Sequence, residues 1–146
     1  MISNIGQASM DSLFLLSGIF YRSCANCVTS HQSIYYRRIT PFPTGFSLYV
    51  NIITQWLSTS NVLNVDFYLY SSWSDLQNDV NRWQYCNYDD GVGFPRDCGP
   101  TGMVAYQWTP RLELGTVSFN VLSVTPTCPC SAGYYRNINY ICTGIL

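Results

Sequence analysis

Seven cysteines are the residues of this chain whose type and spacing point most directly to chemistry. Cysteines at short spacing can bind zinc, act as a redox pair or form structural disulfides. Seven of them in 146 residues are typical of a protein that folds in an oxidising compartment. They are Cys24, Cys27, Cys86, Cys98, Cys128, Cys130 and Cys142.

The spacing argues against zinc and against redox catalysis. A structural zinc site usually takes two close pairs of ligands. Cys24 and Cys27 make one such pair, but one residue alone separates Cys128 from Cys130, and His31 is the only histidine. A thioredoxin-like pair would need a strand that leads into a helix, whereas the following VTSHQSIYYRR indicates a loop and a strand. We therefore interpret the cysteines as disulfide-forming.

Two disulfide expectations follow from the residues themselves. We expect Cys86 and Cys98 to pair, because this bond would close the loop that contains Asp89 and Asp90 and lower its entropy. Seven is an odd number, so we also expect at least one thiol without a partner in the chain. An odd cysteine in a secreted chain suggests a bond to another molecule.

The C-terminal cysteines lie in a further pattern. The stretch CPCSAGY, residues 128–134, is followed after seven residues by Cys142. This spacing, with Gly133 and Tyr134, resembles the C-terminal half of an epidermal-growth-factor-like module, whose signature is Cys-x-Cys-x-x-Gly-aromatic and a final cysteine. The resemblance covers residues 128–142, and the closely spaced upstream cysteines of a complete module are absent.

The resemblance implies a pairing and a location. It implies a bond between Cys130 and Cys142 across a small hairpin, and a bond from Cys128 to an upstream cysteine such as Cys24 or Cys27. With Cys86 bonded to Cys98, the implied pairings leave an odd thiol, which we expect to be Cys24 or Cys27. It also implies an extracellular protein. Fibrous surface appendages of protists, such as flagellar hairs, use epidermal-growth-factor-like modules.

Acidic side chains near the central loop could bind calcium, which prefers several carboxylate and carbonyl oxygens. The segment NYDDGVG lacks the spaced alternation of a calcium-binding loop, so a plain turn is favoured. If calcium binds, Asp89 and Asp90 are the predicted ligands; no other cofactor or metal is expected. The acidic residues considered are Asp79, Asp89, Asp90 and Asp97.

Nothing in the sequence favours catalysis. Glu113 is the only glutamate and lies between two leucines in a strand-like segment. His31 lies in a polar loop without a nucleophile motif beside it. We predict that the protein is not an enzyme.

The composition narrows the classes of partner. Charged residues make up 10% of the chain, against about 25% in typical soluble domains, and the basic residues are all arginines. A surface with few charges is covered at little desolvation cost, which suits permanent assembly or sugar contact. A net charge of −1 offers no basic field for nucleic acid.

The longest apolar run is the region Leu13–Tyr21, which is shorter than the ~20 residues of a membrane-spanning helix. No membrane span is expected. We interpret this run as a buried strand. The alternative is the apolar part of a secretory signal with a cleavage site at Ser23-Cys24-Ala25, although Asp11 and the absence of basic residues before the run argue against it.

Alternation of apolar and polar residues predicts the strands. A different spacing occurs in WSDLQNDVNRW, residues 73–83, where the apolar residues recur every three or four positions. This predicts a short helix at about 75–83, with Ser74 and Gln77 as a capping box. The predicted strands lie within residues 46–56, 62–70 and 116–124, with weaker ones at 33–40 and 103–108.

These elements predict an all-β fold, an antiparallel β-sandwich with one short helix and a small disulfide-closed C-terminal hairpin. We expect a sandwich domain over residues 1–126 and a partial epidermal-growth-factor-like segment over residues 127–146.

Tyr68 and Tyr70 lie on the strand face opposite Phe67 and Leu69, and Tyr49 is expected on the same face of a neighbouring strand. A sheet with aromatic residues on both faces must be covered on both sides. The leading hypothesis is therefore a non-catalytic extracellular structural protein that associates with identical subunits into a filament or surface assembly. The alternative is a carbohydrate-binding or adhesion module that uses this aromatic face.

Overall fold

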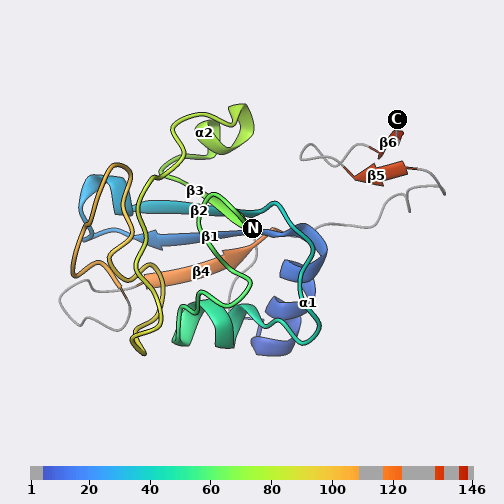
Figure 1. Cartoon of the computed structure of the whole chain (residues 1–146), viewed down its shortest axis with the longest axis horizontal. Helices are drawn as coiled ribbons and strands as arrows, with labels where there is room; N and C mark the ends of the chain where they lie inside the picture. The colour runs from blue at the N-terminus through green and yellow to red at the C-terminus, as the bar shows by residue number, and fades with distance from the viewer. Residues whose placement is uncertain (1–4, 109–116, 123–133, 137–141, 145–146) are drawn as a thin grey trace.

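The computed structural model describes residues 5–108, 117–122, 134–136 and 142–144. Its centre is a four-stranded antiparallel sheet in the order β3-β2-β1-β4 (Figure 1). A second sheet pairs β5 with β6. The strands are β1 Ile19–Cys24, β2 Ser33–Arg38, β3 Phe67–Tyr70, β4 Val117–Val121, β5 Tyr134–Arg136 and β6 Cys142–Gly144. The predicted class was all-β; the antiparallel sheet and the few helices are consistent with the coarser description of a mostly-β fold.

Two helices and two short helical turns accompany the sheet. They are α1 Gln7–Ser17, the 3-10 turn η1 Thr29–His31, the π-helical η2 Tyr49–Thr54 and α2 Trp73–Asn78. α1 and η2 contribute to the core on one face of the sheet, which we call the inner face. α2 packs on the opposite, outer face, as Figure 1 shows.

Aromatic rings fill the inner face. Alternation along three neighbouring strands places Phe20, Tyr36 and Phe67 side by side, and their rings stack with centroids 4.9 and 4.7 Å apart. Phe14 of α1 and Trp56, which follows η2, cover them. Helices and loops cover this face in the described part of the chain, so the predicted second layer of a sandwich is not confirmed.

The predicted strand at Leu13–Tyr21 is wrong in its first half. These residues continue α1 to Ser17, and the strand begins at Ile19. Gly18 separates the two elements: it adopts a left-handed conformation with φ of 66°, and its N–H donates to the Phe14 carbonyl oxygen. This is a common way to end a helix, and it favours glycine.

The predicted strand at residues 46–56 is also wrong, because its centre forms η2. The fully buried residues of this segment are Leu48, Ile52 and Trp56, which are spaced by four and therefore share one side of a helix. Ser47 caps the turn, since its hydroxyl oxygen accepts a hydrogen bond from the Val50 N–H at 3.1 Å.

Two other strand predictions fail wholly or in part. Residues 62–66 form a turn in which Asp66 accepts from the Val62 N–H, so β3 begins only at Phe67. Residues 103–108 form no strand, and Met103 is 64% exposed. The strands predicted at 33–40 and 116–124 are confirmed as β2 and β4.

The helix predicted at 75–83 exists but starts and ends earlier. Its N-cap is Ser72, whose hydroxyl accepts from the Asp75 N–H at 3.0 Å, so the predicted cap at Ser74 is wrong. α2 ends at Asn78, and the C-cap residue Asp79 has a φ of 55°. After this point the chain turns back, and the Trp83 N–H donates to the Leu69 carbonyl of β3.

Candidate functional site

The outer face of the sheet carries the candidate site. Its β1, β2 and β4 residues include Tyr21, Tyr35 and Asn120, which lie next to one another across the strands because Tyr21 is paired with both of the others. α2 covers part of this face, with Leu76 packed against Ile19 and Tyr70. The remainder is only half-buried.

A hollow of about 320 Å³ opens on this face, and we call it the aromatic groove. The rings of Tyr21 and Tyr35 stack with centroids 4.7 Å apart, and the ring of Trp73 lies 5.8 Å from that of Tyr35. Trp73 is the first residue of α2, so the helix supplies one wall. The groove is lined by Tyr21, Tyr35, Trp73, Asn120 and Leu122.

The groove's lining carries no charged side chain. The Tyr21 hydroxyl lies 3.4 Å from the Ser33 Oγ, and the Asn120 amide nitrogen donates to the Ser118 Oγ at 3.2 Å. Burial, and the nearby Tyr21, raise the pKa of Tyr35 above its usual value. Aromatic faces, neutral hydroxyls and one amide therefore contact whatever occupies the groove.

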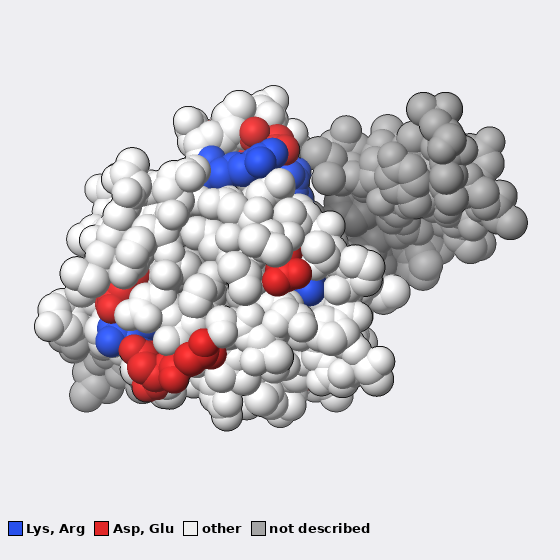
Figure 2. Space-filling model, viewed as in Figure 1, with Lys and Arg blue, Asp and Glu red and all other residues white. Residues whose placement is uncertain are grey.

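A cluster of charges holds α2 in place. Asp79, at the end of the helix, accepts from the Tyr70 hydroxyl at 2.5 Å and from Arg82 at 2.5 and 2.8 Å, and it pairs with Arg37 at 3.0 Å. The Arg82 guanidinium also lies over the Tyr68 ring at 3.8 Å. Figure 2 shows such small mixed patches, one of them at α2, on an otherwise uncharged surface.

The same cluster shifts two pKa values. The hydrogen bonds from Arg82 are the main cause that holds the pKa of Asp79 well below its usual range. Burial, followed by the hydrogen bond to Asp79, raises the pKa of Tyr70. At neutral pH Asp79 is therefore ionised and the Tyr70 hydroxyl is protonated, which is the combination that this hydrogen bond requires.

The predicted aromatic face of Tyr49, Tyr68 and Tyr70 does not exist as one surface. Tyr68 and Tyr70 share the outer face, with ring centroids 6.4 Å apart. Tyr70 is fully buried, however, and Tyr49 belongs to η2 on the inner side. Sequence reasoning missed Tyr21 and Tyr35, although the alternation in IFYRSC and SIYYRR was a signal for both.

The two predicted calcium ligands, Asp89 and Asp90, contact other protein groups in the structure. Asp89 accepts from the Ser58 N–H at 2.9 Å and from its hydroxyl. Asp90 pairs with Arg96 at 2.5 Å. Within the described stretches, no group of three or more acidic, histidine or cysteine side chains is placed to bind a metal. Calcium at Asp89 and Asp90 stays a prediction.

The expected Cys86–Cys98 disulfide is confirmed. The expectation of an odd thiol at Cys24 or Cys27 is wrong, because the two bond to each other. They lie on a tight turn at the end of β1, where the Cys27 N–H donates to the Cys24 carbonyl at 3.3 Å.

The two bonded pairs leave three of the seven cysteines. Of these, Cys128 and Cys130 lie outside the described residues, as does most of the predicted segment 127–146. Cys142 begins β6, and its predicted bond to Cys130 stays a prediction.

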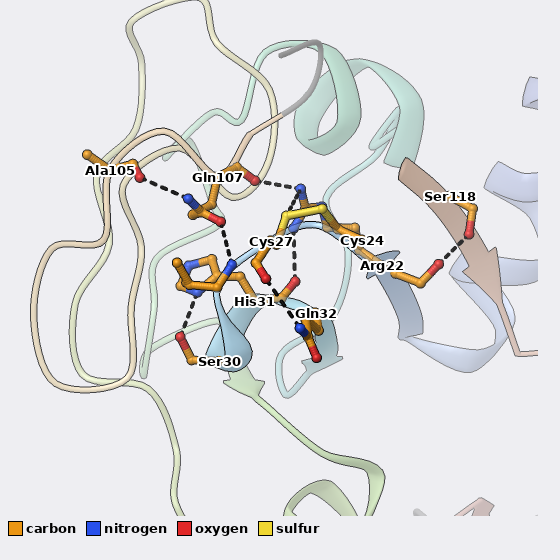
Figure 3. Close-up of a disulfide and its surroundings, with 11 residues drawn as sticks. Arg22, Cys24, Cys27, Ser30, His31, Gln32, Ala105, Gln107 and Ser118 are labelled. Atoms are coloured by element: carbon orange, nitrogen blue, oxygen red, sulfur yellow. Dashed lines mark hydrogen bonds between the residues drawn. A yellow bond between two sulfur atoms is a disulfide. The ribbon is translucent and has the colours of Figure 1, made fainter. Parts of the chain in front are cut away.

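His31, which the sequence places in a polar loop, is buried at the end of the 3-10 turn η1. Its Nε2 lies 2.8 Å from the Cys98 carbonyl oxygen. Its Nδ1 lies 2.9 Å from the Ser30 Oγ, a contact that Figure 3 shows. Burial is the main cause that lowers the pKa of His31 to about 4. Such an imidazole is a weak base at neutral pH, so its contact with the Ser30 hydroxyl does not resemble an activated nucleophile. Glu113 lies outside the described residues.

Next to His31, Arg22 is fully buried. Its guanidinium donates to the carbonyl oxygens of His31 at 3.2 Å and Gln107 at 2.5 Å. Gln107 also accepts from the Val28 N–H through its side chain, at 3.0 Å. Figure 3 shows this polar cluster around the Cys24–Cys27 disulfide.

Comparison of the chain with protein families, with curated proteins and with solved structures gives no match. In the part of the chain that the structure describes, no helix has the length and apolar character that a membrane crossing needs. The two disulfides fit a protein that folds in an oxidising compartment.

Proposed function

We propose that this protein is a non-catalytic extracellular module that binds a carbohydrate in the aromatic groove. The observation that carries the proposal is the row of Tyr21, Tyr35 and Asn120 on adjacent strands, closed on one side by Trp73. The proposal keeps the carbohydrate-binding alternative from the sequence but moves it to other residues of the outer face.

The chemistry of the groove matches that of a sugar ring. One side of a pyranose presents C–H groups that pack on aromatic faces, while its rim carries neutral hydroxyls that both donate and accept. The Asn120 amide and the Tyr21 and Tyr35 hydroxyls offer both functions. A hollow of about 320 Å³ lies at the lower end of the range for small-molecule sites, so we expect one or two sugar rings rather than a long chain.

The extracellular part of the proposal rests on the cysteines. Two disulfides close loops in the described domain. The resemblance of residues 128–142 to half an epidermal-growth-factor-like module supports the same location, and the proposal includes a C-terminal hairpin closed by a Cys130–Cys142 bond.

A glycan array tests the proposal, followed by titration calorimetry with the best ligand and three variants of the full chain. We expect Tyr35→Ala and Trp73→Ala each to weaken binding at least tenfold. Tyr49→Ala is the matched control, because Tyr49 is also a partly exposed tyrosine, at 43%, but lies on the other side of the sheet. Retention on no glycan, or equal affinity in all variants, would contradict the proposal.

A second candidate function is self-association into a filament or surface assembly, as in a flagellar-hair-like appendage. Four apolar side chains on α1 and η2 support it: Leu15, Leu16, Tyr49 and Val50 are 43%, 72%, 43% and 39% exposed. The two elements are adjacent, since Asp11 of α1 accepts from the Tyr49 N–H at 3.1 Å. Exposed apolar groups that lie together often mark a protein interface.

Size-exclusion chromatography over a range of concentrations, with and without reductant, tests this candidate. We expect concentration-dependent oligomers that Leu16→Glu converts to monomers. Val65→Glu serves as the control, because Val65 is also exposed, at 61%, but lies in the turn before β3. A protein that stays monomeric at high concentration under oxidising conditions would exclude the candidate.

A further inference from the structure

Within residues 5–108, Arg22 differs from the other arginines in having no carboxylate partner. Of the five arginines in this range, the other four form an ion pair with an aspartate. Arg22 is nevertheless the most buried, with no exposed surface. A buried charge without a countercharge is strongly disfavoured unless something compensates it.

The contacts of Arg22 compensate its charge only in part. Its Nη atoms donate to the carbonyl oxygens of His31 and Gln107, which are neutral acceptors. Its Nε has no hydrogen-bond partner among the described residues. Its third contact is with the Cys27 Sγ, 3.5 Å from Nη2. This sulfur is one half of the Cys24–Cys27 disulfide and is uncharged while the bond is intact.

We propose that Cys24–Cys27 is a reducible disulfide that accepts electrons from an external dithiol, and that Arg22 stabilises the Cys27 thiolate formed when it opens. The thiolate supplies the negative charge that Arg22 lacks in the oxidised protein. Charge-assisted contacts of this kind are about twice as strong as neutral ones.

A dithiol reduces Cys24–Cys27 through a mixed disulfide. A thiolate of the dithiol attacks the Cys24 Sγ, the S–S bond breaks, and its electron pair goes to the Cys27 Sγ beside Arg22. The second thiol of the reductant then attacks its own sulfur in the mixed disulfide and releases Cys24, which takes up a proton as a thiol. The dithiol is oxidised to a disulfide, the protein gains two electrons, and one proton is released because Cys27 stays ionised.

Access to the bond requires a local opening. Cys24 and Cys27 are 0% and 5% exposed, but Ala25 and Asn26, which form the turn between them, are exposed. The opening affects the rate of exchange and leaves the equilibrium unchanged, so the test is made at equilibrium.

Among the described residues, no charged group competes for Arg22. His31 contributes a carbonyl oxygen, and its imidazole is neutral above a pKa of about 4. Gln107, from the loop on the other side, is neutral. In the described residues, no carboxylate lies within ion-pair distance of the guanidinium.

The second disulfide provides a control within the same chain. The Cys98 Sγ also accepts a hydrogen bond from a buried nitrogen, the Trp56 Nε1 at 3.4 Å. The indole is neutral, so reduction of Cys86–Cys98 gains no ionic contact from it. The two bonds therefore differ in the charge of the neighbouring donor.

The test equilibrates the full-length protein with mixtures of reduced and oxidised dithiothreitol at pH 6, 7 and 8. Differential alkylation and peptide mass mapping then report the redox state of each cysteine. A thiol beside a cation has its pKa lowered from about 8.5 to below about 7.5, whereas a thiol without one stays protonated over most of this range. A reaction that releases one proton has an apparent equilibrium constant that rises tenfold per pH unit.

We expect the reduction constant of Cys24–Cys27 to rise up to tenfold per pH unit, and to exceed that of Cys86–Cys98 at least tenfold at pH 7. The constant of Cys86–Cys98 should stay nearly level from pH 6 to 8. In Arg22→Met, the constant of Cys24–Cys27 should become nearly independent of pH.

Two results would overturn the proposal. One is a reduction constant of Cys24–Cys27 that does not change with pH, and the other is prior reduction of Cys86–Cys98. If near-ultraviolet circular dichroism finds Arg22→Met unfolded, the comparison of the two disulfides in the wild-type protein decides the question alone.

Discussion

On the inner face of the sheet the rings of Phe20, Tyr36 and Phe67 are fully buried, whereas on the outer face Tyr21 and Tyr35 stack on each other and stay half-exposed. Both faces carry aromatic rings, and the rings of the two faces come from alternate residues of the same strands. The difference lies in what covers them. Among the described residues, α1, η2 and the loop that contains Phe94 close the inner face, whereas the short helix α2 covers part of the outer one.

This contrast separates stability from binding. Aromatic rings that are enclosed on all sides contribute their full burial to folding. Rings that keep an accessible face contribute less to folding and retain a surface for a ligand. The predictions below compare the two faces by changing matched residues on each.

The largest effect is expected for Phe20→Ala. Phe20 stacks on Tyr36 and meets Phe94 edge-on at 5.0 Å, so its removal leaves a cavity that the packed core cannot fill. We expect the free energy of unfolding to fall by about 3–5 kcal/mol, measured by urea denaturation. Tyr35→Ala, on the outer face, should cost clearly less. Equal losses would mean that the outer face is as closed as the inner one.

The second effect is a pH dependence at the edge of the inner core, where His31 packs against Trp83 with ring centroids 4.7 Å apart. Burial lowers the pKa of His31 from 6.5 to about 4, so the unfolded chain binds a proton that the folded protein does not. Stability is therefore complete above pH 6.5 and falls as the pH drops toward 4. We expect a loss of about 2 kcal/mol between pH 7 and 5.

Urea denaturation at several pH values measures this loss. His31→Gln should remove most of the pH dependence over the same interval, since glutamine does not titrate. An unchanged slope in the variant would assign the pH dependence to other groups.

A smaller effect is expected for Tyr36→Phe. The Tyr36 hydroxyl donates to the Asn61 Oδ1 at 2.9 Å in a buried site, and its loss leaves that oxygen without its donor. We expect a cost of about 1.5 kcal/mol. Tyr21→Phe is the control on the outer face, because its hydroxyl contact to Ser33 is long, at 3.4 Å, and only partly buried. A similar cost for both would remove the distinction between the faces.

The smallest effect is expected for Asp79→Asn, which weakens the attachment of α2 to the outer face. The Asp79 side chain is 35% exposed, so solvent screens its ion pairs, and we expect a loss of about 1 kcal/mol. Its pKa is lowered in the folded state. Its contribution is therefore present above the unfolded value of 3.8 and disappears as the pH falls below it, unlike that of His31. Thermal unfolding of the wild-type protein and of Asp79→Asn at pH 7 and pH 3 measures the loss of stability and its dependence on pH.

Two strands could be predicted from the alternation of residues along the chain. β2 and β4 lie where their patterns placed them, and the loop-closing bond between Cys86 and Cys98 follows from spacing and turn chemistry. The aromatic groove was not predicted, because its residues come from separate segments of the chain: β1, β2, the end of β4 and the start of α2. Their proximity depends on strand order, which local patterns do not specify.

The errors have a common physical origin. In residues 46–56, Leu48 and Ile52 are compatible with a period of two and with a helical spacing of four, so periodicity alone does not distinguish them. The Ser47 cap and the contacts of Asp11 with this segment select the helical form. At α1 the deciding signal was Gly18, which indicates a helix end rather than the interior of a strand.

The absence of lysine has a consequence for proteolysis. Trypsin-like enzymes must draw a basic side chain into a deep acidic pocket, and every basic residue of this chain is an arginine. Arg22, Arg37 and Arg38 have nearly buried side chains, while the more exposed Arg82 and Arg96 are bonded to aspartates. Each of these five arginines must break an existing contact before it can be recognised. Residues 5–108 of the folded protein should therefore resist such proteases and become cleavable at these positions on unfolding.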